Sequence, residues 1–322
     1  MNTTVNGTSC FSAANAVAGK IGKTLVFCLI LVVSLVGNSC LAVIACKTQT
    51  MRKPINYLIT NMAISDLLYP LFFLPLKITQ LYVESWLISG LPGQVLCKLR
   101  AFLNNVSTVV SIESLVLITV DRFGAVVFPL RSPLISSKLC PLFILATWIV
   151  AMAVNSPHLF SSKLIKYPGK LSCESRWNEA FGETSSYGNF GLAMFVVFLY
   201  IPFALLAILY SIILIKLKTQ VFPGEQLANA EEHRTRRNRK VLMMSIAIVL
   251  GFFVCFVPYS IIILLRFFAW DSTSVSCGIT RLNFITLYLV YANCAINPCI
   301  CFIFSGNYRR GLKRLLNCTA QD

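Results

Sequence analysis

Residues 97–129 read CKLRAFLNNVSTVVSIESLVLITVDRFGAVVFP and are too long and too apolar a stretch for a helix in a soluble core. Cys97 and Arg122 lie 25 positions apart in this stretch. At about 1.5 Å per residue, a helix covers about 37 Å between them, enough to cross about 30 Å of hydrocarbon with some tilt. The stretch therefore predicts a transmembrane helix, with a cysteine at one membrane face and the Asp121-Arg122 pair at the other.

One face of this helix is mostly polar. Side chains that recur every three or four residues share a helix face. The members of this face are Asn104, Thr108, Ser111, Leu115, Ile118 and Arg122. Lipid cannot satisfy polar groups, so such a face must contact protein or water. We therefore expect this helix to lie inside a bundle.

The composition is that of a membrane protein, because 57% of the 322 residues are hydrophobic. A soluble domain and a disordered chain are both excluded on this ground. The net charge of +16 lies in loops between apolar runs, which does not favour nucleic-acid binding. Two His residues and the absence of a CxxC pair argue against a metal site of the zinc type, and most of the 13 Cys residues lie within apolar runs.

Hydropathy predicts an all-α membrane protein, a bundle of seven transmembrane helices with a short amphipathic eighth helix. The expected spans are 24–46, 57–81, 95–127, 139–160, 187–217, 241–268 and 279–304. Residues 306–316 form the amphipathic helix, whose basic side chains would face lipid headgroups. We therefore divide the chain into an extracellular tail (1–23), a seven-helix domain (24–304), and an amphipathic helix with a short cytoplasmic tail (305–322).

Lys and Arg predict the orientation. With the N-terminus outside, more than half of the 28 Lys and Arg residues fall in inner segments, as the positive-inside rule requires. This orientation favours a multi-pass protein of the plasma membrane. It also places two glycosylation sequons outside, at Asn2 and Asn6, and makes Cys318 a candidate for palmitoylation. Unused sequons and an unmodified Cys318 are the alternatives.

Each expected span carries one short motif. In chain order these are Gly37-Asn38, Asn61-Met62-Ala63-Ile64-Ser65-Asp66, Asp121-Arg122-Phe123, Trp148, Pro202 with Tyr210, Phe252 with Pro258, and Asn297-Pro298. The order and spacing resemble the rhodopsin-like (class A) family of G-protein-coupled receptors over residues 36–316. Residues 51–57 and the outer loop with Trp86 are similar to those of its neuropeptide receptors. The resemblance implies a receptor and not an enzyme, with a heterotrimeric G protein, arrestin and receptor kinases as inner partners.

The resemblance also implies an activation switch in the inner half of the bundle. Its residues would be Asp121, Arg122, Tyr210, Phe252, Phe256, Pro258, Asn297, Pro298 and Cys301. The sequence departs from the family at three places. Phe256 replaces a Trp, Cys301 replaces the Tyr that would share a water with Tyr210, and the start of the sixth span lacks the acid that holds Arg122 in many relatives.

Asp66 lies in the middle of the second span, where an ionisable side chain is costly and is a functional candidate. By resemblance it would hold a sodium ion and a water network. The other members would be Asn38, Ser111, Asn293 and Asn297. Cys294 replaces a Ser found in many relatives, which weakens one ligand position. An Asp that is protonated or only hydrogen-bonded is the alternative, and no other cofactor is implied.

Two disulfides are implied outside the membrane. Cys97 and Cys173 match the family's bridge between the third helix and the second outer loop, and an outer location permits it. Cys10 and Cys277 form a second outer pair, whose bridge would brace the mouth of the bundle. Free thiols are the alternative for each pair.

The ligand class follows partly by exclusion. The seventh span contains no Lys for a retinal Schiff base, and Asn104 stands where monoamine receptors have an Asp. The expected ligand-binding residues are Asn104, Asn105, Thr108, Tyr259, Tyr288 and Tyr291, with no buried charge among them. A long second outer loop and a rim of both charges favour a peptide. A small non-peptide ligand and, from another class, a transporter or channel are the alternatives.

Overall fold

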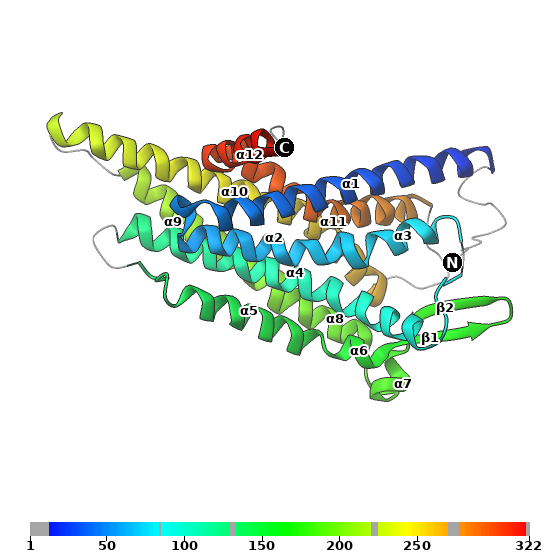
Figure 1. Cartoon of the computed structure of the whole chain (residues 1–322). Helices are drawn as coiled ribbons and strands as arrows, with labels where there is room; N and C mark the ends of the chain where they lie inside the picture. Colours follow the sequence, from blue (N-terminus) through cyan, green and yellow to red (C-terminus); the bar gives the residue numbers. More distant parts are fainter. Residues whose placement is uncertain (1–12, 84, 129–132, 220–224, 270–276, 320–322) are drawn as a thin grey trace.

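The computed structural model describes residues 13–83, 85–128, 133–219, 225–269 and 277–319. Within these residues, seven segments are long and apolar enough to cross a membrane, which confirms the predicted seven-helix fold. They are Gly19–Lys47, Pro54–Gln80, Gly90–Val127, Cys140–Ser161, Tyr187–Lys218, Arg239–Phe268 and Arg281–Phe304. Their helices run side by side as one elongated bundle (Figure 1).

Four of the spans are single helices and three are interrupted. The unbroken helices are α1 (Ala13–Lys47), α4 (Gly90–Val127), α10 (Glu225–Phe268) and α11 (Cys277–Phe304). The interrupted spans are α2 (Pro54–Phe72) with α3 (Leu74–Gln80), α5 (Cys140–Asn155) with α6 (Pro157–Ser161), and α8 (Tyr187–Phe195) with α9 (Ile201–Thr219) through the π-helical turn Val196–Tyr200. Pro75, Pro157 and Pro202 lie next to these interruptions. A proline has no N–H for the helix ladder and clashes with the preceding turn, which explains their positions.

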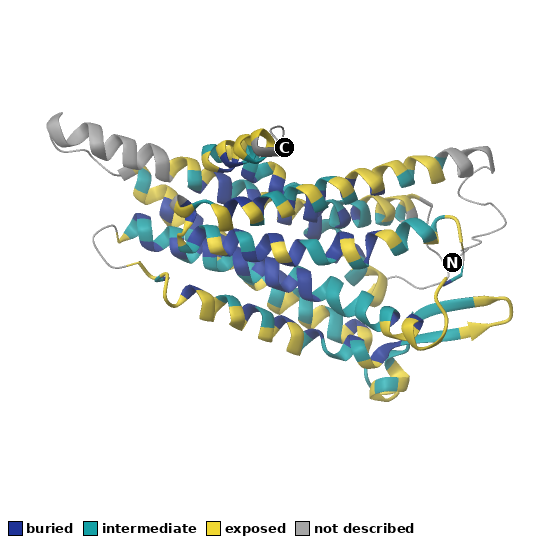
Figure 2. Cartoon of the chain, in the orientation of Figure 1, coloured by how far each residue is buried: buried dark blue, intermediate teal, exposed yellow. Residues whose placement is uncertain are grey.

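Helix α4 has the central position predicted for it. It packs against α2, α5 and α9, and its inward side chains Ile112, Leu115 and Ile118 are buried in the main core. Figure 2 shows buried residues facing the middle of the bundle and exposed residues on its outer side. Many exposed residues on the spans are large and apolar, such as Leu142 and Ile208, as expected of helices that face lipid.

A β-hairpin, which the all-α prediction did not include, lies at one end of the bundle (Figure 1). Strands β1 (Ser162–Tyr167) and β2 (Lys170–Ser175) are antiparallel and paired from Ser162 with Ser175 to Tyr167 with Lys170. The predicted disulfide between Cys97 and Cys173 is present, with Cα atoms 5.7 Å apart, and ties β2 to α4. The backbone N–H and C=O groups of the helices are already hydrogen-bonded within each helix. A segment that the disulfide holds across the bundle therefore pairs its backbone groups with one another, as a hairpin does. We call this the hairpin end.

Several helix boundaries differ from the expected ones. Helix α1 begins at Ala13, so the expected tail 1–23 includes its first turns, and α10 begins at Glu225, well before residue 241. The amphipathic helix α12 (Gly306–Thr319) ends later than residue 316 and packs on α1. A Cβ added to Gly311 would lie 2.3 Å from Cγ2 of Ile44, so glycine permits this close contact. The short 3₁₀ helix η1 (Gln49–Met51) links α1 to α2.

Candidate functional site

A cavity of about 460 Å³ opens between the helices at the hairpin end. Most of its wall residues lie on α4, α8, α10 and α11, and the hairpin adds Ser162, Cys173, Glu174 and Ser175. Five of the six expected ligand-binding residues line it: Asn104, Asn105, Thr108, Tyr259 and Tyr291. Tyr288, the sixth, lies outside this lining and packs against Phe27, with ring centroids 4.9 Å apart.

The polar side chains on α4 are only partly satisfied by their own helix. Asn105 Nδ2 donates to the carbonyl of Ala101 at 2.8 Å, and Thr108 Oγ1 donates to the carbonyl of Asn104 at 3.2 Å. The Oδ1 atom of Asn104 is buried without a donor among the described residues. Buried polar atoms are nearly always paired, so this oxygen marks a position for a ligand group or a water.

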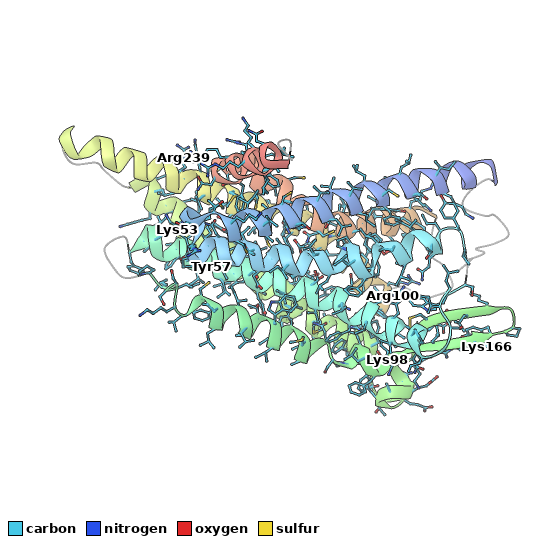
Figure 3. All side chains as sticks on the ribbon, in the orientation of Figure 1. Lys53, Tyr57, Lys98, Arg100, Lys166 and Arg239 are labelled. Carbon is cyan, nitrogen blue, oxygen red and sulfur yellow. A yellow bond between two sulfur atoms is a disulfide. The ribbon has the colours of Figure 1, made fainter. Side chains whose placement is uncertain are left out.

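The expectation of a cavity without charge is wrong. Arg100 and Glu174 belong to its lining, and Figure 3 shows Arg100 at the same end of the bundle as Lys98 and Lys166. Arg100 follows Cys97 by less than one helical turn, and Glu174 follows Cys173 directly. Their positions next to the two bridged cysteines were the signal in the sequence, because the bridge brings both neighbourhoods to the mouth of the cavity.

Asp66 links three helices in the middle of the bundle. Its side chain is 2% exposed, Ser111 Oγ on α4 donates to its Oδ1 at 2.9 Å, and Asn297 Nδ2 on α11 donates to its Oδ2 at 2.7 Å. Ser65 and Ser111 also share a hydrogen bond of 2.8 Å. A buried carboxylate with donors from two other helices fixes their relative positions.

One expected member of this network, Asn38, contacts another helix in place of Asp66. Asn38 Nδ2 donates to the carbonyl of Cys294 at 2.8 Å and so ties α1 to α11. Cys294 Sγ donates to the carbonyl of Tyr291 at 3.3 Å. The Oδ1 atoms of Asn38, Asn293 and Asn297 are buried and lack a donor within the described residues. Carboxylate, hydroxyl and amide oxygens are the ligands of hard cations, so the residues around Asp66 fit a small cation or water.

The far end of α4 carries the Asp121-Arg122 ion pair. Arg122 Nε donates to Asp121 Oδ2 at 3.1 Å, and Asp121 is buried. Thr119, one turn earlier, donates through Oγ1 to the hydroxyl of Tyr210 on α9 at 3.0 Å. Cys301 on α11 is fully buried in the same core cluster as Tyr210. The hydrogen bond connects α4 and α9 at the end opposite the hairpin, and Cys301 of α11 belongs to the core cluster there.

Aromatic packing joins the cavity to this inner core. Phe256 lines the cavity and stacks on Phe252 in the core, with centroids 5.6 Å apart and ring planes at 16°. Pro258 lies within α10, two residues beyond Phe256, and Pro298 lies within α11. A Cβ added to Gly37 of α1 would lie 2.7 Å from Cβ of Pro298, so α1 and α11 are in close contact there.

Several predicted modification sites fall outside the described residues. Asn2, Asn6 and Cys10 are among these, and the side chains of Cys277 and Cys318 are not described. Glycosylation, palmitoylation and the second disulfide therefore stay predictions.

Comparison with known proteins agrees with this arrangement. The chain is similar to a QRFP-like peptide receptor of Branchiostoma floridae, at 28% identity over 92% of this chain and 77% of the relative. It is similar to an allatostatin-A receptor of Bombyx mori (29%, over 89% and 77%) and to neuropeptide Y receptor type 1 of Xenopus laevis (27%, over 89% and 78%).

The match to a family model settles the classification. Residues 37–300, well over half of the chain, match the model described as 7 transmembrane receptor (rhodopsin family). With seven membrane-spanning segments and the motifs of each helix in place, the chain belongs to the rhodopsin family of seven-transmembrane receptors.

Proposed function

We propose that this protein is a plasma-membrane receptor that binds an extracellular peptide in the cavity and activates a heterotrimeric G protein at the opposite end. The main support is that one helix, α4, extends from the cavity to the opposite end of the bundle. This one helix places Asn104 in the cavity, Ser111 on Asp66, and Arg122 at the far end. The hairpin end is then extracellular, which agrees with its disulfide, and the N-terminal tail lies outside.

A peptide suits both the cavity and the hairpin above it. A volume of about 460 Å³ is within the usual range for ligand pockets and would admit the end of a peptide. The rest of the peptide would lie on the hairpin end, where Lys163 contacts Glu179 at 2.8 Å and Arg176 contacts Glu174 at 3.1 Å. The hydrogen bond from Lys163 holds the pKa of Glu179 below its ordinary value, so this surface carries both charges near neutral pH. The relatives bear the names of peptide receptors, which supports the same ligand class.

Signal transmission would use the contacts between the two ends. A peptide that moves Phe256 also moves Phe252, because the rings are stacked, and so disturbs the packing of α10 on α11. The far end would respond by release of Arg122 from Asp121 and rearrangement around Tyr210 and Cys301. A sodium ion at Asp66, with Ser111 and the nearby Asn side chains, would stabilise the resting arrangement.

The remaining assignments concern the two membrane faces. Residues 305–322 would form the inner amphipathic segment, with Cys318 palmitoylated and with arrestin and receptor kinases as later partners. Outside, Asn2 and Asn6 would carry glycans, and a bridge from Cys10 to Cys277 would brace the mouth of the cavity. None of these assignments requires catalytic activity of the chain.

Nucleotide exchange on purified G proteins tests the proposal. Full-length receptor in lipid nanodiscs is incubated with G-protein subtypes and a neuropeptide library, and GTP-analogue uptake is measured. We expect peptide-dependent exchange that the variant Arg122→Gln loses while peptide binding persists. Exchange driven only by small non-peptide compounds would favour the second ligand class, and solute flux in proteoliposomes without exchange would contradict a receptor function.

A further inference from the structure

Two cations lie beside one aromatic ring at the edge of the cavity. Lys77 Nζ is 5.3 Å from the ring centroid of Phe73, and Arg100 Cζ is 5.8 Å from the same centroid. Arg100 Cζ is also 5.6 Å from the ring of Trp86. Phe73 and Arg100 line the cavity, so the charge of Arg100 belongs to its wall. Lys77 is outside this lining but shares the Phe73 ring with Arg100.

Neither cation has an ion pair with a described acidic residue. Glu174 lines the same cavity, but it pairs with Arg176 at 3.1 Å. The nearest buried carboxylate along α2, that of Asp66, accepts hydrogen bonds from Ser111 and Asn297. Aromatic faces compensate a buried cation less well than a carboxylate does, so the positive charge here is only partly balanced.

Three hydrogen-bond donors on Arg100 and on rings next to Phe73 or Arg100 also lack partners. They are Arg100 Nε, the hydroxyl of Tyr69 and the indole Nε1 of Trp86, all buried without an acceptor in the described part of the chain. Tyr69 and Trp86 are each 6% exposed, and the Tyr69 ring lies 4.8 Å from that of Phe73. Native proteins rarely leave such donors unpaired. A carboxylate matches this set, because its two oxygens accept several hydrogen bonds and carry the opposite charge.

Asn104 adds one unpaired acceptor beside these donors. It lies one helical turn from Arg100 on α4, and its Oδ1 is buried without a donor. A ligand that presents a donor next to its anionic group would pair this oxygen. In the last residue of a peptide, the backbone N–H and the α-carboxylate are attached to the same Cα atom, which supplies this combination.

We propose that the cavity binds the C-terminus of a peptide with a free α-carboxylate. The carboxylate contacts Arg100 at a subsite next to Phe73, where Lys77 adds a second positive charge and Tyr69 and Trp86 lie nearby, and the last backbone N–H donates to Asn104. This inference rests on the proposed peptide-binding function and adds the chemistry of the peptide's end. An amidated C-terminus is neutral and offers one acceptor oxygen in place of two, so it would leave the positive charge unbalanced and one donor unpaired, and would bind less tightly.

Thermal unfolding of the purified full-length receptor tests this subsite without the natural ligand. The probes, at millimolar concentration, are N-acetyl-Leu-Phe, N-acetyl-Leu-Phe-amide and N-acetyl-Asp-Phe-amide. We expect the free acid N-acetyl-Leu-Phe to raise the melting temperature of the receptor. The apparent Kd of N-acetyl-Leu-Phe-amide should be about tenfold higher or more, because the amide cannot form the charge-assisted hydrogen bonds. The variant Arg100→Gln should abolish the preference for the acid.

Matched variants separate recognition from folding. Lys98→Gln removes a cation at the same end of the bundle but outside the cavity lining, so it should keep the full preference for the acid. Arg100→Lys keeps the charge without the forked donors, so the preference should shrink but persist. This variant also keeps the test decisive if Arg100→Gln does not fold.

The outcomes that overturn the inference are distinct. Equal stabilisation by acid and amide would remove the carboxylate and leave a peptide cavity in place. Equal stabilisation by N-acetyl-Leu-Phe and N-acetyl-Asp-Phe-amide would move the anionic group to a side chain and overturn the terminal assignment. If no probe stabilises the wild type, or if Arg100→Gln keeps the preference, the subsite is wrong. Peptide-dependent nucleotide exchange still decides the proposed function by itself.

Discussion

Substitution of Asp66 separates its charge from its hydrogen bonds. In the wild type, Ser111 Oγ donates to Asp66 Oδ1 at 2.9 Å, and in Asp66→Asn the amide Oδ1 can still accept this hydrogen bond. The Asn297 amide can turn over, so that its Oδ1, which is unpaired in the wild type, accepts from the new Nδ2. The network keeps its shape and loses only the charge that a cation requires. In Asp66→Ala both hydrogen bonds are lost as well.

The expected effects differ in size and in sodium dependence. A bound ion stabilises the folded state by RT ln(1 + [L]/Kd), or about 1.4 kcal/mol at ten times Kd, which corresponds to a few degrees in the melting temperature. The wild type should show this gain in melting temperature in NaCl, and neither variant should show it. Without sodium, Asp66→Asn should be at least as stable as wild type, because no charge is buried. Asp66→Ala should lose about 1.2 kcal/mol, taking about 0.6 kcal/mol for each hydrogen bond within a membrane.

The assay compares melting temperatures of purified receptor in NaCl and in N-methyl-D-glucamine chloride at equal ionic strength. Agonist affinity under the same two conditions, once an agonist is known, provides a second readout. A sodium-dependent gain that persists in Asp66→Asn would refute the assignment of the ion to this carboxylate. A wild type that responds equally to both salts would show that Asp66 has only a structural role.

Three further outcomes are expected. Cys97→Ala/Cys173→Ala should abolish ligand binding at the cell surface, because loss of the bridge frees the hairpin and costs about 2–5 kcal/mol; wild-type affinity at normal surface level would contradict this. Asn104→Ala should lower agonist potency more than Asn104→Gln does, by about five- to a hundredfold for an unpaired ligand donor, in a concentration–response assay matched for expression. Cys301→Tyr should raise agonist-independent signalling by about two- to tenfold through a water shared with Tyr210, and adding Tyr210→Phe should erase the gain; an intact gain in the double variant would mean that Tyr acts by bulk in this fully buried position.

The candidate site could be read from the sequence only where a side chain's own helix fixes its direction. Asn104, Asn105 and Thr108 follow from their place on the inward face of α4, and all three line the cavity. Tyr288 was expected to line the cavity with Tyr291, but it packs between Tyr291 and Phe27 of α1 and lies outside the lining. A difference of three residues rotates a side chain by about 60° around the helix, enough to move it from the cavity to a neighbouring helix.

The sequence also did not predict which charged residues line the cavity. Arg100 and Glu174 read as rim residues in the sequence, because charged residues near the ends of spans usually extend to water. In the structure Arg100 instead lies over the rings of Phe73 and Trp86. Phe73, Trp86 and Arg100 come from three different segments of the chain, so no local sequence pattern predicts that they lie together.

The sequence by itself determined the number of spans, their order and the amphipathic helix, because the free energy of transfer into lipid belongs to each segment alone. Only the tertiary structure decided which buried polar groups meet. Ser111 and Asn297 reach Asp66, whereas Asn38 reaches the carbonyl of Cys294, and Lys77 shares Phe73 with Arg100. Such contacts depend on the rotation, tilt and interruption of each helix. These are set by packing against neighbours and not by hydropathy.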